Sequence, residues 1–340
     1  MGFGGEVMAS SSGQAGMESK PWIEKYRPQS LEDLVAHREV TDTVDRLVAK
    51  DRLPHLLFYG PPGTGKTSTA LAIARRVYGS GWQNMTLELN ASDERGIGVV
   101  RDQIMAFAGT QRLFSSGFKL IVLDEADAMT GDAQAALRRV IEKYTRNTRF
   151  IMICNYVSKI IPALQSRCTR FRFSPLGDSF VSDRIAHVLR EEAVEGDEAG
   201  IRAVTRLGRG DLRKCLNILQ STYLSTGRIS EEGVYATTGN PLPTDLLKIR
   251  DWMLQEEFEA AYKHIVALKT NKGLALVDIV REVHPLVMDL HLPPRARCDL
   301  LERLGDIEYH LAHGTTERVQ LSATVGAFAQ ARAQILQAAA

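Results

Sequence analysis

Several features that often decide the class of a protein are missing from this sequence. No run of apolar residues approaches the roughly 20 that a helix needs to cross a bilayer, so we expect no membrane-spanning segment and no membrane partner. The first residues are rich in Gly, Ser and Met and lack the apolar core of a secretory signal. We interpret residues 1–20 as a disordered tail, and whether they carry a targeting signal of another kind stays open.

Strong net charge and paired cysteines are absent as well. The 42 basic and 41 acidic side chains give a net charge of +1, so any nucleic-acid binding has to come from a local patch. The chain has four cysteines but no C-x-x-C pair, and no histidine stands at zinc-finger spacing. This pattern disfavours a metal centre held by cysteine, or a disulfide framework, and favours reduced thiols.

A glycine-rich segment is present, and it carries most of the information: Phe58-Tyr59-Gly60-Pro61-Pro62-Gly63-Thr64-Gly65-Lys66-Thr67. It fits the pattern G-x-x-x-x-G-K-[ST] and stands between the apolar run Leu56–Tyr59 and a helical stretch that starts near Ser68. Glycines let backbone N–H groups turn toward a triphosphate, Lys66 reaches its β- and γ-phosphates, and Thr67 offers a hydroxyl to Mg²⁺. The order strand, loop, helix predicts nucleotide binding, without saying what the nucleotide is for.

Polar side chains follow two further apolar runs. Lys119–Leu123 ends in Asp124 and Glu125, and Phe150–Cys154 ends in Asn155. The ends of parallel strands meet near the phosphate loop, so Asp124 is placed to hold Mg²⁺ and Glu125 to orient or deprotonate the attacking water. The amide of Asn155 suits a sensor of the γ-phosphate or of that water.

The residues Asp124-Glu125-Ala126-Asp127 also spell the DEAD signature of RNA helicases. Such helicases need two full α/β motor domains, the second of which supplies arginines to the shared site. In this chain the alternation of strands and helices ends near Ser174 and only helical patterns follow. This organisation disfavours a helicase.

Two arginines are candidates for contacts to phosphate. Arg167 stands just beyond the sensor strand, from where it can project into the nucleotide site of a neighbouring subunit, which requires an oligomer. Arg213 lies in the first turn of a helical stretch that Asp211 is suited to cap. Arg213 is either a surface charge or, if that stretch folds back over the core, a contact to the γ-phosphate of its own chain.

Basic residues are concentrated in one part of the chain. Between Ala133 and Phe173 there are nine basic residues and a single acid, Glu142. The helix expected over Ala133–Tyr144 has an apolar face, and Arg138 lies off that face. A solvated helix face, contacts to a phosphate backbone and a subunit interface all fit this pattern.

The coarse organisation is an α/β part followed by helices. Short apolar runs alternate with helical patterns from Leu31 to about Ser174, which predicts an open parallel sheet flanked by helices. After that point the strand signal stops, and the breaker cluster Gly239–Pro243 divides the helical remainder. We predict a tail at 1–20, an α/β core at 21–174 and helical domains at 175–239 and 240–340.

Six signatures occur in one order along the chain: Trp22–Pro28, Gly60–Thr67, Leu89–Asp93, Asp124–Met129, Ser166–Cys168 and Gly210–Arg213. Together they resemble the AAA+ ATPases and, within them, the small subunits of replication factor C, the eukaryotic sliding-clamp loader. The family often has Asp-Asp-Arg-Gly where this chain has Asp93-Glu94-Arg95-Gly96, a change that keeps the charge. One subunit of that complex has a degraded phosphate loop, whereas this chain has an intact one.

The resemblance implies a fold, cofactors and partners. It implies an AAA+ P-loop ATPase core, a small helical lid domain and an all-α collar domain that joins five different subunits into an open ring. The implied cofactors are ATP and Mg²⁺. The implied partners are the other replication factor C subunits, the trimeric clamp (proliferating cell nuclear antigen) and primer–template DNA, in the nucleus. ATP binding would open the clamp, and DNA-triggered hydrolysis would release it closed on DNA.

The resemblance also implies roles for single residues. Lys66, Glu125 and Asn155 would be catalytic, with Arg167 acting on the adjacent subunit, and Thr67 and Asp124 would hold Mg²⁺. The DNA candidates are Arg95, Arg101 and Arg138. The adenine and phosphates would be bound by Ile23, Glu24, Lys25, Tyr26, Arg27, Val35, Gly60, Pro61, Pro62, Gly63, Thr64, Gly65, Lys66, Thr67, Ser68, Asn155 and Arg213.

Two other functions stay open at this point. One is a scaffold subunit that binds ATP without needing to hydrolyse it, although the intact Glu125 favours hydrolysis. The other is a different AAA+ remodeller, such as a branch-migration motor. That motor would need a wedge for DNA junctions or hexameric self-assembly.

Overall fold

The structure is a computed structural model that describes residues 20–31, 33, 35–50, 52–92, 97–109 and 117–339, with the side chains at 35, 97–101 and 337–339 outside the description. The expected tail, except Lys20, and Arg95 therefore lie outside the described residues, as do the side chains of Val35 and Arg101. Backbone contacts divide the chain into two units, Met1–Glu195 with Val204–Ser221 and Gly196–Ala203 with Thr222–Ala340. The division into a core, a lid and a collar stays a prediction.

The first unit is built on a parallel sheet. Within the described residues the sheet has five strands in the order β2-β3-β4-β1-β5, and all neighbouring strands run parallel. The three apolar runs named in the sequence lie in strands of this sheet, at Leu56–Tyr59, Lys119–Asp124 and Thr148–Cys154, and the predicted fold class is confirmed. The strands are β1 (Leu56–Tyr59), β2 (Thr86–Asn90), β3 (Lys119–Asp124), β4 (Thr148–Cys154) and β5 (Thr169–Arg172).

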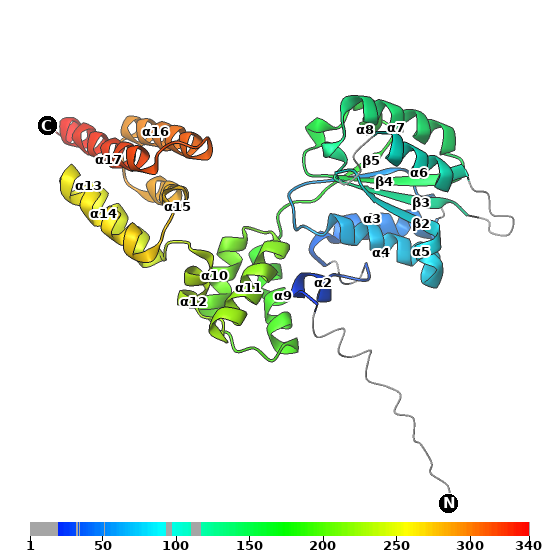
Figure 1. Ribbon diagram of the computed structural model, residues 1–340, viewed down its shortest axis with the longest axis horizontal. Coiled ribbons are helices and arrows are strands. Elements are labelled where there is room, and N and C mark those ends of the chain that lie inside the picture. The colour runs from blue at the N-terminus through cyan, green and yellow to red at the C-terminus, as the bar shows by residue number, and fades with distance from the viewer. Residues whose placement is uncertain are drawn as a thin grey trace, which may run out of the picture. The chain divides into compact units, whose positions relative to one another are not determined.

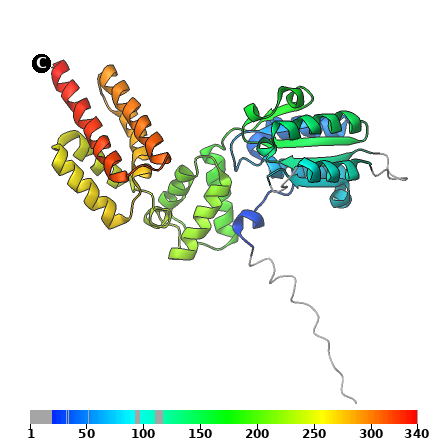
Figure 2. The same cartoon turned by 45° about the horizontal axis from the view of Figure 1, so that its top comes forward.

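Helices cover both faces of this sheet, which can be followed in Figures 1 and 2. The α-helices of this part are α2 (Trp22–Lys25), α3 (Arg38–Ala49), α4 (Lys66–Tyr78), α5 (Trp82–Met85), α6 (Ile97–Gly109), α7 (Gly131–Tyr144), α8 (Pro162–Gln165) and α9 (Asp178–Glu191). Short 3-10 turns lie at η1 (Val35–His37), η2 (Gly79–Gly81), η3 (Ala126–Ala128) and η4 (Val157–Lys159).

Two apolar layers fix these helices to the strands. Successive side chains of a strand point to opposite faces, so the buried run in β3 supplies Leu120 to one layer and Ile121 to the other. The Leu120 layer is completed by α3 and α4, and the Ile121 layer by α6, α7 and α8. Because both faces are covered, β1, β3 and β4 are nearly continuous apolar sequences. The carboxyl ends of β3 and β4 then carry the polar residues.

The remaining helices are α10 (Glu198–Gly208), α11 (Leu212–Thr226), α12 (Glu231–Thr238), α13 (Pro243–Gln255), α14 (Phe258–Lys272), α15 (Leu276–Asp289), α16 (Pro294–Ala312) and α17 (Glu317–Ala339). Glycine or proline stands at the ends of several of these helices. Gly239 and Gly273 end α12 and α14 in the left-handed conformation, and Pro294 stands in the first turn of α16. In Figures 1 and 2, α16 and α17 lie side by side.

The second unit has a core of its own. Helices α13 to α17 bury one continuous apolar cluster in which Ile249, Val283 and Phe328 are fully covered. Aliphatic side chains at helical spacing supply this cluster, as the sequence pattern predicts. None of the helices in the described part of the chain combines the length and the apolar character that crossing a membrane requires.

Candidate nucleotide-binding site

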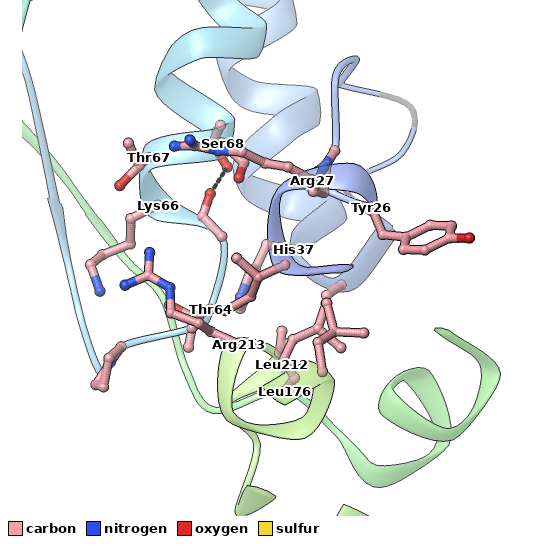
Figure 3. Close-up of a pocket in the computed structure, with 18 of the residues that line it drawn as sticks. Tyr26, Arg27, His37, Thr64, Lys66, Thr67, Ser68, Leu176, Leu212 and Arg213 are labelled. Atoms are coloured by element: carbon pink, nitrogen blue, oxygen red, sulfur yellow. Dashed lines mark hydrogen bonds between the residues drawn. The ribbon is translucent and has the colours of Figure 1, made fainter. Parts of the chain in front are cut away.

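A pocket of about 320 Å³ opens in the first unit, at the carboxyl end of the sheet. Its walls come from α2, the loop between β1 and α4, the ends of β3 and β4, and the start of α11. Figure 3 shows Lys66 and Thr67 on one side and Tyr26 and Arg27 on another, while the side chain of Arg213 extends toward Lys66. Segments far apart in the sequence therefore converge on one cavity of the size that ligand sites usually have.

Glycine is required at two positions of the loop. Gly60 and Gly63 have φ values of +143° and +67°, which strongly favour glycine. A Cβ on Gly60 would lie 1.9 Å from the carbonyl oxygen of Phe173, and a Cβ on Gly63 would lie 1.6 Å from Oδ1 of Asp211. The loop thus packs directly against two other segments, which fixes its path around the pocket.

The start of α4 is arranged to receive an anion. The helix begins at Lys66, no side chain caps its first turn, and no acidic residue stands there. The free N–H groups of a helix N-terminus and the positive end of its dipole attract negative charge. The residues present at this helix end therefore fit the phosphates of a nucleotide.

Lys66 is a buried cation beside this helix end. Its Nζ donates to the carbonyl oxygens of Gly60 and Pro61, at 2.7 and 2.8 Å, and to Oδ1 of Asn155 at 3.1 Å. Burial lowers the pKa of Lys66; Asp124 opposes this shift, and the positive charge of Arg213 adds to it. Two cations that converge on one cavity, one of them buried, need an anion between them, which is a second sign that phosphate fits here.

The predicted metal ligands touch each other. The Thr67 hydroxyl donates to Oδ2 of Asp124 at 2.6 Å, and Oδ1 of Asp124 accepts from the backbone N–H of Glu125 at 2.8 Å. A hydroxyl and a carboxylate are oxygen ligands of the kind that Mg²⁺ prefers together with phosphate oxygens. Glu125 is exposed at the pocket and holds a left-handed backbone conformation, φ 53° and ψ 37°, which is uncommon outside glycine and recurs at functional sites.

Asp127 has a role that sequence reasoning missed. Its Oδ2 accepts from the backbone N–H groups of Asn155 and Tyr156, at 3.2 and 3.1 Å, and so ties the end of β4 to the acidic loop after β3. Asn155 in turn contacts Lys66. The signal was present, because Asp127 is the third acid of the motif, but its partners are backbone groups 28 and 29 residues away.

The other end of the pocket is lined by α2 and the residues after it. Ile23, Glu24, Tyr26 and Arg27 line the pocket, whereas Lys25 lies outside the lining and pairs with Glu192 at 2.8 Å. The Tyr26 hydroxyl also donates to Glu192, at 2.6 Å, and burial with this contact raises the pKa of Tyr26. The carboxylate of Glu192 thereby anchors two consecutive residues of this segment to the end of α9.

Several lining residues carried no signal in the sequence. They are the apolar side chains of Leu176 and Phe180, which suit the flat base of a nucleotide, and the polar ones of His37 and Arg184. Asn90 and Leu212 also line the pocket, and both belong to signatures seen in the sequence. The ring of His37 packs edge-on against Phe173 at 4.9 Å, and burial lowers its pKa. Gly60 and Pro61 do not line the pocket; their carbonyl oxygens face Lys66 instead.

The start of α11 is bound to the phosphate loop. Asp211 caps the helix as predicted, since its Oδ1 accepts from the N–H of Lys214 at 3.0 Å. The N–H of Leu212 donates to the carbonyl oxygen of Gly63 at 3.3 Å, and the next residue, Arg213, lines the pocket. Arg213 thus belongs to the same cavity as the phosphate loop of its own chain.

Arg167 and Arg138 lie outside this pocket. Arg167 follows α8, and its guanidinium group contacts Ala163 and Glu142 of the same chain. Arg138 is exposed on α7 and also contacts Glu142. The pocket therefore brings together the predicted residues Lys66, Thr67, Asp124, Glu125, Asn155 and Arg213, whereas Arg167, predicted to act on the site of an adjacent subunit, lies outside it.

The fold and this pocket define an ATPase of the AAA class, and comparison with known proteins agrees. Residues 56–176 match the family model of the ATPase family associated with various cellular activities, and residues 241–327 match that of the replication factor C C-terminal domain. The chain is therefore an ATP-hydrolysing AAA+ enzyme that binds nucleotide.

Comparison with similar proteins shows which family of AAA+ ATPases the chain belongs to. The chain is 57% identical to mouse replication factor C subunit 5 over 91% of each chain. It is 54% identical to rice replication factor C subunit 3, over 97% of this chain and 92% of that protein. It is 47% identical to subunit 3 of Saccharomyces cerevisiae, over 94% and 96%. The chain belongs to the replication factor C small-subunit family, which implies assembly with other replication factor C subunits.

One detail of the sequence had indicated which small subunits these relatives would be. The segments Asn155-Tyr156 and Thr169–Phe173 look most like the subunit called 5 in animals and 3 in yeast, and the relatives confirm this prediction. Among solved structures, the RuvB Holliday junction branch migration motor of Thermotoga maritima matches with a TM-score of 0.51 at 16% identity, over 79% of this chain and 93% of that one. This likeness shows the AAA+ fold and nothing further.

Proposed function

We propose that this chain is an ATPase subunit of the five-membered replication factor C clamp loader. It uses ATP binding and hydrolysis to open the sliding clamp and to load it onto primer–template DNA in replication and repair, in the nucleus. One observation carries the proposal: a chain of the replication factor C small-subunit family has a pocket lined by Lys66, Thr67, Asp124 and Glu125, while Arg167, the proposed arginine finger for a neighbour, lies outside it. A pocket of that kind is half of a site shared with a neighbour.

Each wall of the pocket has a task in binding Mg²⁺–ATP. The N–H groups at the start of α4 and the ammonium group of Lys66 hold the phosphates. Thr67 and Asp124 hold the metal, which neutralises the charge of the leaving diphosphate when it is bound. Tyr26 and Arg27 close the adenine side.

The residues for hydrolysis lie around the position of the γ-phosphate. Glu125 orients the attacking water and accepts its proton, and Asn155 holds Lys66 in place. Arg213 contacts the γ-phosphate, so that closure of α11 on the phosphate loop depends on the bound nucleotide. The side chain of Arg167 extends into the nucleotide site of the adjacent subunit and stabilises the transition state there.

The proposed partners come from membership of the replication factor C family. The other replication factor C subunits complete the ring through the helical 240–340 region, and the ring grips the clamp (proliferating cell nuclear antigen) and DNA. Arg138, on the exposed face of α7, contacts DNA phosphates together with Arg101 of α6 and Arg95. These contacts would make DNA the trigger for hydrolysis.

The substitution Glu125→Gln in the reconstituted five-subunit complex tests the catalytic role. We expect nucleotide binding to persist and DNA-stimulated hydrolysis at this site to fall about 100-fold or more, because a general base typically contributes that much. Asp132→Asn, which removes another exposed acid of the same region, is the matched control. Unchanged hydrolysis and normal clamp loading in the Glu125→Gln complex would instead favour an ATP-binding scaffold.

The oligomeric state separates the proposal from a branch-migration motor. We expect the chain to form a complex of five different subunits and to copurify with its clamp from cells that express it at native level. Mass measurement of the purified chain alone and with candidate subunits checks this expectation. A stable homohexamer would contradict the clamp-loader function.

A further inference from the structure

The guanidinium group of Arg167 is engaged by its own chain at both terminal nitrogens. Nη1 donates to the carbonyl oxygen of Ala163 at 2.6 Å, and Nη2 donates to Oε1 of Glu142 at 2.5 Å. An arginine that binds phosphate in forked geometry uses these same N–H groups. Arg167 therefore has to release Glu142 before both ends of its guanidinium group can face a phosphate.

Glu142 is unusual in its surroundings. It is the only acid between Ala133 and Phe173, a stretch with nine basic residues. Its Oε1 also accepts from Nε of Arg138 at 3.1 Å, so that two arginines share one carboxylate. The hydrogen bonds from Arg138 and Arg167 hold the pKa of Glu142 below its usual range, which is the direction expected when two cations stabilise one carboxylate.

The position of Glu142 has no explanation in packing. It lies on the exposed side of α7, away from the buried face formed by Leu137, Val140 and Ile141. Arg167 itself is partly exposed. An ion pair between exposed groups adds little to the stability of a fold, so breaking it costs little free energy. Arg167 can therefore exchange Glu142 for a more highly charged partner. A triphosphate on an adjacent subunit is such a partner.

We infer that Glu142 restrains Arg167: its carboxylate holds the arginine on its own chain until the nucleotide phosphates of the adjacent subunit take its place. Glu142 is thus a positioning residue, and it acts on the site of the neighbour rather than on the pocket of its own chain. The inference rests on the proposed role of Arg167 as the finger in that shared site. It gives the single acid of the basic stretch a function.

The test uses the reconstituted complex with Glu142→Gln, which keeps the shape of the side chain and removes its charge. We expect hydrolysis without DNA to rise about two- to fivefold, as expected for the loss of one exposed ion pair. The affinity of the complex for a nonhydrolysable ATP analogue should rise by a similar factor. Asp132→Asn on the same helix, which removes an equal charge from an exposed acid, should change neither quantity.

A second background shows whether Glu142 acts through Arg167. In a complex with Arg167→Ala, adding Glu142→Gln should have no effect on hydrolysis or on affinity for the analogue. An increase that persists in this background would overturn the inference, as would an unchanged or lower rate in Glu142→Gln alone. If Arg167→Ala by itself leaves hydrolysis unchanged, the proposed finger role fails, and the inference fails with it. If Arg167→Ala lowers hydrolysis but Glu142→Gln leaves it unchanged, the role of Glu142 is rejected while the finger role of Arg167 stands.

Discussion

The backbone N–H of Leu212 donates a hydrogen bond to the carbonyl oxygen of Gly63, and this contact joins the phosphate loop to the helix that carries Arg213. The side chain of Asp211 fills the space beside Gly63 where a Cβ would otherwise point. Binding of phosphate by the loop and placement of Arg213 are therefore mechanically linked within one unit. The link does not depend on any side chain of the loop itself.

Gly63→Ala should weaken nucleotide binding. The added Cβ would lie 1.6 Å from Oδ1 of Asp211, so the loop and α11 would have to separate. Alanine would also have to adopt the left-handed backbone conformation of Gly63, which favours glycine. We expect at least about a tenfold loss of ATP affinity, equivalent to about 1.4 kcal/mol, measured by calorimetry. Gly79→Ala is the matched control, because it has φ +56° but open space around its Cβ. Equal losses in both variants would mean that backbone strain alone is responsible.

Asp127→Ala should lower the turnover number more than the affinity for ATP. Without its carboxylate, the backbone of Asn155 and Tyr156 loses its anchor, and Asn155 no longer holds Lys66 in one position. We expect about a tenfold lower kcat with a smaller change in KM, since misplacement of a positioned group affects the transition state most. Asp127→Asn keeps one acceptor oxygen and should recover part of the rate. A change confined to KM would argue against this role.

The stability of the first unit should depend on pH through His55, which is buried at the start of β1. Its Nδ1 accepts from the N–H of Phe150 at 3.2 Å, and the Thr145 hydroxyl, which donates to Ile141, lies 3.3 Å from Nε2. Both contacts suit a neutral ring that carries its proton on Nε2. Burial, with a smaller effect of Arg149, lowers the pKa of His55 to about 4.

In the unfolded chain His55 therefore binds a proton below about pH 6.5, whereas in the folded chain it binds one only below about pH 4. The free energy of unfolding should fall as the pH drops through this window, by about 2 kcal/mol between pH 7.5 and 5 from this group alone. Urea unfolding at both pH values measures the fall, and His55→Gln serves as the nontitrating reference. If the fall is the same in the wild type and in His55→Gln, His55 makes no such contribution.

Arg138→Gln should weaken DNA binding by the complex in a manner that depends on salt. Loss of one phosphate contact lowers the slope of log affinity against log salt by about 1, whatever the DNA sequence. Fluorescence anisotropy with primed DNA at several salt concentrations gives the slope. Lys263→Gln, an exposed lysine of the second unit that pairs with Glu259, controls for the change in net charge. An unchanged slope would remove Arg138 from the DNA contacts.

The sequence by itself determined the elements and the chemistry of the phosphate loop. Buried parallel strands need continuous apolar runs, and a glycine loop that approaches a phosphate tolerates few residues, so β1, β3 and β4 and the segment Gly60–Thr67 were readable directly. Local rules also placed the cap at Asp211 and the break at Gly239.

Only the tertiary structure decided which distant residues meet. Asp127 binds backbone groups at the end of β4, Glu142 shares its carboxylate between Arg138 and Arg167, and Glu192 anchors Tyr26. Hydrogen bonds to backbone groups leave no pattern in side-chain types, and exposed charges look alike in a sequence whatever they face. The pairings of Asp127, Arg167 and Glu192 depend on how the layers stack, so no periodicity or spacing indicates them. The Arg138–Glu142 pair differs, because its i, i+4 spacing on a helix is a local pattern.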